Sequence, residues 1–305
     1  MFRHRGRGDA SNDPRSAAED RTGAGANYSG VGTALLTGAS SGLGRALAWR
    51  LAREGYDLVL VARRRRILDE LAMEIIREYR RRVVVLPLDL AATHRLIPEI
   101  EAGLAREDIT PSSISLIVNN AGNGVHGPFV DETEEELHRR IRLNIDAPAA
   151  IIRWGIELFR SSRRSGENAG PHTNSAFPPT ICNIASVASF TPGPWMASYY
   201  AAKGWLLALG EAIAEEVRND GIRVVTCCPG PFASDFHRSA GIDARRLGRL
   251  PTADRVAGQI LRAIHRGRPV APIGVGPTVW AVVGPRLPRG WSRRLVAIVQ
   301  RRRFG

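Results

Sequence analysis

The chain contains almost no lysine. Of its 43 basic residues, Lys203 is the only lysine, and the other 42 are arginine. An ammonium is a compact charge with three rotatable donors, whereas a guanidinium is a planar fork that always stays charged. A chain that uses arginine everywhere else has therefore kept a chemically different cation at one position. That position is the first candidate for function.

Cysteine is also scarce. The three cysteines, Cys182, Cys227 and Cys228, show no C-x-x-C spacing and lie in apolar, strand-like runs. We therefore expect buried, reduced thiols in a cytoplasmic protein rather than a disulfide framework or a metal site. The seven histidines are scattered without ligand spacing, so no metal is predicted.

Long apolar runs are missing as well. No run reaches the ~18 apolar residues that a membrane-spanning helix needs. Residues 1–30 are rich in Gly, Arg, Ser, Asp and Ala and contain no apolar h-region. We expect a disordered N-terminal tail there rather than a signal peptide.

Acidic residues are nearly absent from the C-terminal part. Residues 241–305 hold 14 Arg against Asp243 and Asp254, which accounts for +12 of the net charge of +13. Within residues 276–305, Trp291, Leu295 and Ile298 recur at helical spacing beside arginines, which predicts a basic amphipathic extension. Peripheral contact with an anionic membrane and a lid over a substrate pocket both remain open. Nucleic-acid binding is not expected, because no recognition motif accompanies the charge.

Strand-like and helical segments alternate along the middle of the chain. Strands are expected at 31–36, 57–62, 83–88, 114–118, 180–185 and 222–228. Helical spacing covers 45–55, 93–107, 131–159 with a joint near 146–148, and 197–219, and a polar loop covers 161–179. This alternation predicts one α/β domain over residues 31–275, with a parallel sheet covered by helices on both faces.

A glycine-rich turn, Thr37-Gly-Ala-Ser-Ser-Gly-Leu-Gly44, joins the first predicted strand to the first helix. Backbone N–H groups and a helix N-terminus in this context hold a phosphate, so nucleotide binding is predicted. Ala62 and Arg63 stand where an acid would bind a free ribose 2'-hydroxyl. An arginine there can pair with a 2'-phosphate, which favours NADP, with NAD possible, and makes Arg63 the first choice. Alternatively, arginines 63–66 only begin a helix.

Tyr199 lies four residues before Lys203, so a helix places both side chains on one face. A positive charge near a phenol favours the phenolate and lowers its pKa from ~10. Such a pair could pass a proton to or from a substrate oxygen. The alternative is a packed aromatic ring and a solvated lysine. Asn144, in an apolar helical segment, is either a satisfied packing residue or part of a proton relay.

The glycine-rich turn, Asn119-Asn-Ala-Gly122, Ser186, Tyr199-x-x-x-Lys203 and Pro229-Gly230 follow one another in the order of the classical short-chain dehydrogenase/reductase family, which the chain resembles over about residues 30–270. The resemblance implies a single Rossmann-type, doubly wound domain and a homo-oligomer that assembles through helices near 147–160 and 198–219. It implies Tyr199 as acid/base, Ser186 as hydrogen-bond partner of the substrate oxygen, and Lys203 as holder of the nicotinamide ribose that lowers the Tyr199 pKa. Asn144 would hold a water that links Lys203 to solvent.

The same resemblance implies a set of cofactor contacts. They are Gly38, Ser40, Ser41, Gly42 and Leu43 at the pyrophosphate and ribose, Asp89 and Leu90 at the adenine, Asn120 and Gly122 near the ribose, and Pro229, Gly230 and Phe232 at the nicotinamide, together with Arg63, Tyr199 and Lys203. Ser41 replaces a base that is frequent in NADP-using members, so recognition of the 2'-phosphate falls more heavily on Arg63.

These features predict an NADP-dependent oxidoreductase that reversibly reduces a carbonyl group of a small molecule. Phe190, Trp195, Met196, Phe232 and Phe236 suggest a lipophilic substrate, although they could equally belong to the core. A second function class stays open, an NADP-binding regulatory or scaffold protein without turnover.

Overall fold

The computed structural model describes residues 31–92, 95–164, 177–234 and 250–304. A seven-stranded sheet forms the centre of this part of the chain, and all neighbouring strands in it are parallel. The strands are β1 (Thr33–Thr37), β2 (Asp57–Ala62), β3 (Val83–Pro87), β4 (Ile114–Asn119), β5 (Thr180–Ile184), β6 (Arg223–Pro229) and β7 (Val270–Ile273). Their order is β3-β2-β1-β4-β5-β6-β7, so the direction of winding changes between β1 and β4.

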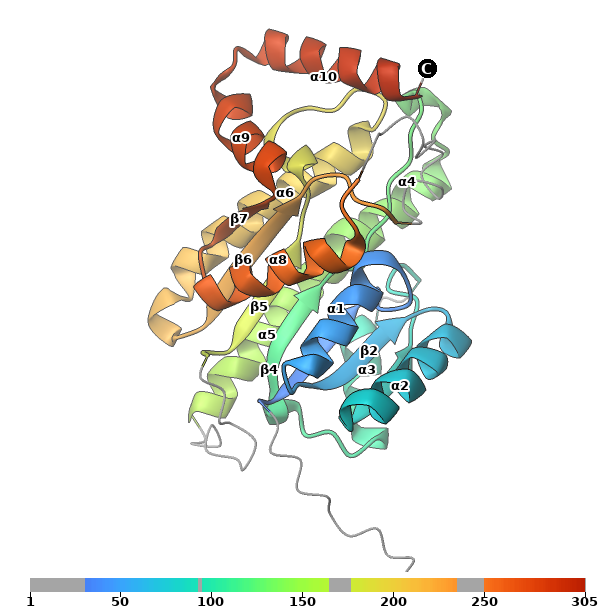
Figure 1. The fold of residues 1–305 in the computed structure, drawn as a ribbon, viewed down its shortest axis with the longest axis vertical. Helices are drawn as coiled ribbons and strands as arrows, with labels where there is room; N and C mark the ends of the chain where they lie inside the picture. The colour runs from blue at the N-terminus through green and yellow to red at the C-terminus, as the bar shows by residue number, and fades with distance from the viewer. Residues whose placement is uncertain (1–30, 93–94, 165–176, 235–249, 305) are drawn as a thin grey trace, which may run out of the picture.

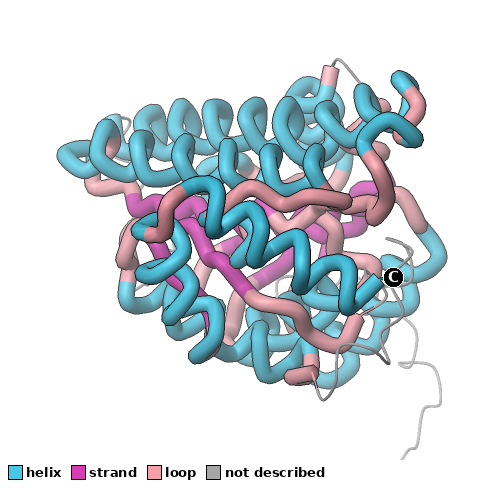
Figure 2. The backbone as a smooth tube through the Cα atoms, turned by 90° about the horizontal axis from the view of Figure 1, so that it is seen from above, coloured by secondary structure: helices cyan, strands magenta, loops and turns pink. Residues whose placement is uncertain are grey.

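Helices cover both faces of this sheet (Figure 1 and Figure 2). Successive side chains of a strand point to opposite faces, and in β1 Leu36 packs into one apolar core whereas Leu35 packs into the other. The first core contains α1 (Gly42–Arg53), α2 (Arg65–Tyr79) and α8 (Ala253–Arg266). The second contains α3 (Leu96–Arg106), α5 (Ala147–Arg164) and α6 (Ala197–Glu216). The predicted doubly wound parallel sheet is therefore confirmed.

The predicted strand boundaries agree with the structure to within two residues. Neither α8 nor β7 was predicted from the sequence. The second of these is a short strand that contains Pro272 and lies at the edge of the sheet. Proline is tolerated at an edge because no further strand needs its missing N–H, and it weakens the strand signal in the sequence.

The joint predicted near residues 146–148 is a change of helix type at Asp146 and Ala147 and not an interruption of the helix. From α4 (Glu134–Ile141) the chain continues through a π-helical turn, Arg142–Asp146, into α5 without a break. Pro148 has no N–H to donate, and in the wider turn the N–H of Ala147 donates to the carbonyl of Arg142. Asn144, in this turn, is buried. The predicted loop at 161–179 also starts later, because α5 extends to Arg164; residues 165–176 lie outside the described part.

The chain ends in two helices, α9 (Val275–Val283) and α10 (Arg289–Phe304), which lie together at one end of the molecule (Figure 1). The boundary predicted between residues 275 and 276 falls in the first turn of α9. The tail predicted for residues 1–30 lies outside the described residues. Within the described ranges, every helix is too short or too polar to cross a membrane.

Candidate active site

A cavity of about 980 Å³ lies at the carboxyl ends of the strands, where the winding of the sheet changes direction. It brings together residues that the sequence analysis selected far apart in the chain. In its wall are Gly38, Ser40, Ser41, Gly42, Leu43, Arg63, Asp89, Leu90, Asn120, Gly122, Ser186, Tyr199, Lys203, Pro229, Gly230 and Phe232. Of the predicted site residues, Asn144 alone is not in the wall. The described residues contain no cluster of His, Cys, Asp and Glu suited to a metal ion.

The glycine-rich turn after β1 is fixed by the segment that follows β4. Thr37 Oγ1 accepts hydrogen bonds from the N–H groups of Asn120 and Ala121, each at 3.0 Å, and Asn120 Nδ2 donates to the Thr37 carbonyl at 2.9 Å. Gly38 has φ +68°, in the region that favours glycine. A Cβ at Gly44 would overlap the backbone oxygen of Gly38. The N-terminus of α1 therefore lies against the turn, in the geometry that suits a phosphate.

The structure divides the four arginines after β2 into two pairs. Arg63 and Arg64 line the cavity, and Arg64 Nη2 donates to the backbone and side-chain oxygens of Ser40 at 3.1 and 3.0 Å. Arg65 and Arg66 instead form ion pairs with acids one turn further along α2. Two of the four arginines thus belong to the surface of a helix and two line the cavity, and pairing of Arg63 with a 2'-phosphate stays a prediction.

Asp89, just after β3, is held in a fixed orientation. Its Oδ1 accepts the N–H of Ala91 at 3.1 Å, and its Oδ2 accepts Arg139 Nη2 at 2.6 Å. Burial alone would raise the pKa of Asp89, but these two hydrogen bonds and the charges of Arg139 and Arg63 together lower it below its usual value. The carboxylate is therefore ionised in the cavity wall, and its contact with an adenine stays a prediction.

Tyr199 and Lys203 lie on one face of α6, next to the residue that follows β5. The side chains of Ser186 and Tyr199 form a hydrogen bond, and Ser186 Oγ accepts the N–H of Ala188 at 3.1 Å. Lys203 Nζ donates to the carbonyl of Ile184 at 2.8 Å and lies 6.0 Å from the centroid of the Tyr199 ring. Lys203 is only 5% exposed, so the alternative of a solvated lysine is wrong.

Burial is the largest cause of the pKa shifts of Tyr199 and Lys203. It raises the pKa of Tyr199 to about 12, although the hydrogen bond with Ser186 acts in the opposite direction. It also lowers the pKa of Lys203 to about 8, because a buried ammonium loses its hydration. The expected lowering of the Tyr199 pKa is thus reversed in this structure. At neutral pH, Tyr199 is a phenol and Lys203 is predominantly an ammonium.

Gly122 separates Lys203 from Asn144. A Cβ at Gly122 would lie 2.8 Å from Asn144 Oδ1 and 3.2 Å from Lys203 Nζ, so a larger residue would push both groups away. Asn144 Nδ2 donates to the backbone oxygens of Asn123 and Arg140, both at 3.1 Å, while Oδ1 is buried without a hydrogen-bond partner among the described residues. Asn144 is therefore not the fully satisfied packing residue of the alternative interpretation.

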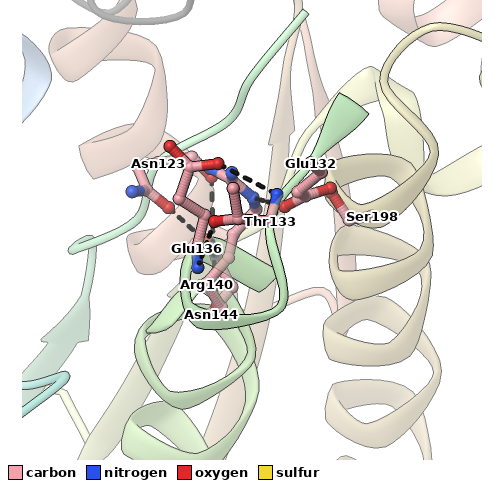
Figure 3. Close-up of polar contacts among 7 residues, drawn as sticks. All are labelled: Asn123, Glu132, Thr133, Glu136, Arg140, Asn144 and Ser198. Atoms are coloured by element: carbon pink, nitrogen blue, oxygen red, sulfur yellow. Dashed lines mark hydrogen bonds and ion pairs between the residues drawn. The ribbon is translucent and has the colours of Figure 1, made fainter. Parts of the chain in front are cut away.

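A buried ion pair beside Asn144 was missed by the sequence analysis (Figure 3). Arg140 Nε donates to Glu132 Oε1 at 2.5 Å, and less than a tenth of either side chain is exposed. Ser198 Oγ donates to Glu132 Oε2 at 2.9 Å, which ties the segment before α4 to the first turn of α6. The Thr133–Glu136 capping box of α4 was recognisable in the sequence. The contact from Glu132 to Ser198 has no local signal.

The two C-terminal helices form part of the cavity wall, as the lid interpretation expects. Their contribution consists of Gly276, Pro277, Trp280, Leu295, Val296, Val299 and Gln300. Gln300 Nε2 donates to the hydroxyl of Tyr200 at 2.8 Å, which joins α10 to α6. A Cβ at Gly230 would lie 2.8 Å from Pro277, so α9 packs closely on the segment after β6.

Only some of the apolar residues suggested for the pocket line the cavity. Met196 and Phe232 line the cavity. Phe190 and Trp195 are absent from its wall, because Phe190 packs on the second apolar core and the Trp195 ring faces the Arg301 guanidinium at 4.7 Å. Phe236 lies outside the described residues. The cavity is nevertheless apolar on one side, owing to residues of α9 and α10.

Comparison with known proteins identifies the family of the chain. A family model described as short chain dehydrogenase matches residues 32–244. The very-long-chain 3-oxoacyl-CoA reductase of Coprinopsis cinerea is 28% identical over 193 residues, which cover 63% of this chain and 52% of that protein. The chain spans about half the length of the first curated relatives that it matches.

Solved structures show the same architecture. The complex of a short-chain dehydrogenase from Sphingobium yanoikuyae with NADPH has a TM-score of 0.69 and 31% identity, and the match covers 84% of this chain and 93% of that one. The bulky-bulky ketone specific alcohol dehydrogenase from Comamonas testosteroni has a TM-score of 0.65 and 28% identity, with 84% and 92% covered.

Proposed function

The chain belongs to the short-chain dehydrogenase family, and from this premise we propose that it is an NADP-dependent oxidoreductase that reversibly reduces a lipophilic ketone, aldehyde or oxoacyl compound to an alcohol. The observation that supports this most directly is that Ser186, Tyr199 and Lys203 line the same cavity as the glycine-rich turn. The left-handed Gly38 and the close packing at Gly44 leave room beside the N-terminus of α1 that suits a dinucleotide pyrophosphate.

In this proposal the bound nicotinamide supplies the hydride, and the protein supplies position and protons. Ser186 and Tyr199 donate hydrogen bonds to the substrate oxygen, and Tyr199 transfers its proton to that oxygen as negative charge develops. The pKa of about 12 suits this role, because Tyr199 holds its proton at neutral pH until the alkoxide forms. Lys203 holds the nicotinamide ribose, and a water held at Asn144 links Lys203 to solvent.

The preference for NADP over NAD is supported by Arg63 and Arg64, which line the cavity next to the turn. A guanidinium makes forked hydrogen bonds with a 2'-phosphate. The relative from Sphingobium yanoikuyae was solved with NADPH, which agrees with this choice.

The lipophilic substrate class is supported by the apolar side of the cavity. Met196, Phe232, Trp280, Val296 and Val299 line it, and apolar walls with few polar groups bind apolar molecules. Relatives described as acting on very-long-chain 3-oxoacyl-CoA and on bulky ketones are consistent with a large carbonyl compound.

The same proposal places the enzyme in the cytoplasm as a homo-oligomer, with peripheral membrane contact through residues 276–305. The oligomer, with contacts through α5 and α6, rests on the family resemblance, and light scattering on the full chain tests it. The membrane contact is supported by the exposed apolar and basic side chains of α9 and α10.

The test of the activity is NADPH oxidation with a panel of long-chain and cyclic ketones. We expect Tyr199→Phe to lower kcat by about a hundredfold or more, because it removes the proton donor, while NADPH binding measured by fluorescence persists. Tyr79→Phe, which removes the same hydroxyl outside the cavity wall, is the matched control and should keep wild-type turnover.

Wild-type turnover by Tyr199→Phe would contradict the role given to that tyrosine. Tight NADPH binding by the wild type without turnover of any carbonyl would instead favour the second candidate, an NADP-binding regulatory or scaffold protein.

A further inference from the structure

The outward-facing sides of α9 and α10 carry a concentration of exposed apolar side chains. We call this surface the outer face and define it by Val275, Val279, Val282, Val283, Trp291, Leu295 and Ile298. These are seven of the eleven exposed large hydrophobic residues in the described part of the chain. On each helix they recur three or four residues apart, so they share one side. Apolar patches of this kind on a protein surface mark sites of interaction.

The charge around the outer face is of one sign. Arg286, Arg289, Arg293, Arg294 and Arg301 are all exposed beside it, and the sequence has no acidic residue after Asp254. Elsewhere, exposed arginines such as those of α2 pair with acids one turn away. Arg301 faces the Trp195 ring, whereas Arg289, Arg293 and Arg294 are exposed on a helix that carries no acid, so their charge is available to an anionic partner.

The outer face adjoins the cavity. Leu295 is 43% exposed and also lines the cavity wall. On the same helix Val296 and Gln300 are buried and line the cavity, whereas Trp291 and Ile298 face outward. Helix α10 thus lies between the cavity and the exposed apolar surface, and Leu295 lies at the edge between the two.

We propose that the outer face docks on the surface of an anionic bilayer and that lipophilic substrates pass from the membrane past Leu295 into the cavity. The valines and Trp291 enter the boundary between headgroups and acyl chains, and the arginines pair with lipid phosphates. A second copy of the chain fits this surface poorly, because a two-fold contact would place the arginine clusters against each other. The route of the substrate rests on the proposed carbonyl reduction; the docking does not.

The docking is tested with the full chain and sedimented vesicles. Vesicles of phosphatidylcholine alone are compared with vesicles of two parts phosphatidylcholine and one part phosphatidylglycerol. We expect the protein to bind the anionic vesicles at least tenfold more strongly, and to lose that preference in high salt. Equal partition into both kinds of vesicle, or no binding to either, overturns the proposal.

Two double variants separate the contribution of charge to vesicle binding from the contribution of apolar contact. Arg293→Glu with Arg294→Glu should weaken binding to anionic vesicles by about tenfold or more, and Trp291→Ser with Ile298→Ser should weaken it to a similar extent. The matched controls lie on α2, at the opposite end of the molecule (Figure 1). They are Arg66→Glu with Arg77→Glu and Met73→Ser with Ile76→Ser, all at exposed positions, and they should bind as the wild type does. Circular dichroism verifies that each variant is folded.

An activity measurement tests the route of the substrate. A long-chain methyl ketone embedded in anionic vesicles should be reduced at least tenfold more slowly by the Arg293/Arg294 variant than by the wild type, whereas a short, water-soluble ketone should be reduced equally. Equal slowing of both ketones overturns the route. If the wild type reduces neither ketone, the proposed function fails, and the vesicle binding still decides the docking. A dimer that the Trp291/Ile298 variant dissociates, without vesicle binding, would assign the outer face to a contact between copies.

Discussion

Replacing Lys203 by methionine should make the protein more stable at neutral pH. Methionine has a similar length and shape but no charge, and Lys203 is buried. The pKa of Lys203 falls from 10.5 to about 8 in the folded protein. At about 1.4 kcal/mol for each tenfold change, this corresponds to a cost of about 3 kcal/mol for holding the ammonium inside. The lost hydrogen bond to Ile184 offsets about 1 kcal/mol of the gain, which leaves about 2 kcal/mol.

The gain should depend on pH in a defined direction. Below about pH 8 the amine is charged in both the folded and the unfolded state, and the folded state bears the full cost. Between about pH 8 and 10.5 the folded protein releases this proton while the unfolded chain keeps it, so the wild type becomes more stable as pH rises. The advantage of Lys203→Met is therefore largest at pH 7 and disappears near pH 10. Burial also raises the pKa of Cys228, but this thiol is present in both proteins.

Urea unfolding followed by circular dichroism, at pH 7 and near pH 10, measures the difference between the two proteins. Arg153→Met, which removes a cation from an exposed position on α5, should change the free energy of unfolding by less than about 0.5 kcal/mol at either pH. A Lys203→Met protein that is destabilised equally at both pH values would show that the ammonium is not held at a cost. If the Lys203→Met protein is more stable than the wild type but inactive, the wild type keeps the charge of Lys203 for function at a cost in stability.

Three further substitutions follow from the site geometry. Gly44→Ala should destabilise the protein by about 2–3 kcal/mol in urea unfolding, because its Cβ meets the backbone of the glycine-rich turn, whereas Gly290→Ala, which has open space, should be neutral or slightly stabilising. Arg63→Ala should lower kcat/KM for NADPH about tenfold or more and that for NADH less than about threefold; the same result with Arg66→Ala would remove the assignment to the 2'-phosphate. Glu132→Gln should cost about 3–5 kcal/mol of unfolding free energy, since it leaves a buried guanidinium without its carboxylate, and a loss below about 1 kcal/mol would contradict the importance of the pair.

Local sequence determined the sheet and the order of its elements. Leu58–Ala62 is apolar and lies between Asp57 and Arg63, and β2 forms at Asp57–Ala62 as predicted. Such runs identify strands because burial on both faces of a parallel sheet requires nearly continuous apolar residues. The family resemblance rested on short motifs, and the family model that matches residues 32–244 confirms it. Tyr199 and Lys203 could be paired from the sequence because their spacing is that of one helical turn.

The surroundings of Tyr199 and Lys203 depend on how segments that are distant in the sequence pack together. Glu132 meets Ser198 across 66 positions, and Gln300 meets Tyr200 across 100. No local pattern encodes such contacts. The sign of the Tyr199 pKa shift was also beyond the sequence, because it depends on how completely neighbouring elements exclude water.

The C-terminal helices show most clearly which features follow from the sequence and which depend on the tertiary structure. Their composition predicted an amphipathic, basic extension and left a lid and a membrane contact as separate alternatives. Only the folded chain shows that one side of α10 lines the cavity while another side exposes apolar residues between arginines. Periodicity determines which residues of a helix share a face. The rest of the tertiary structure decides what each face meets.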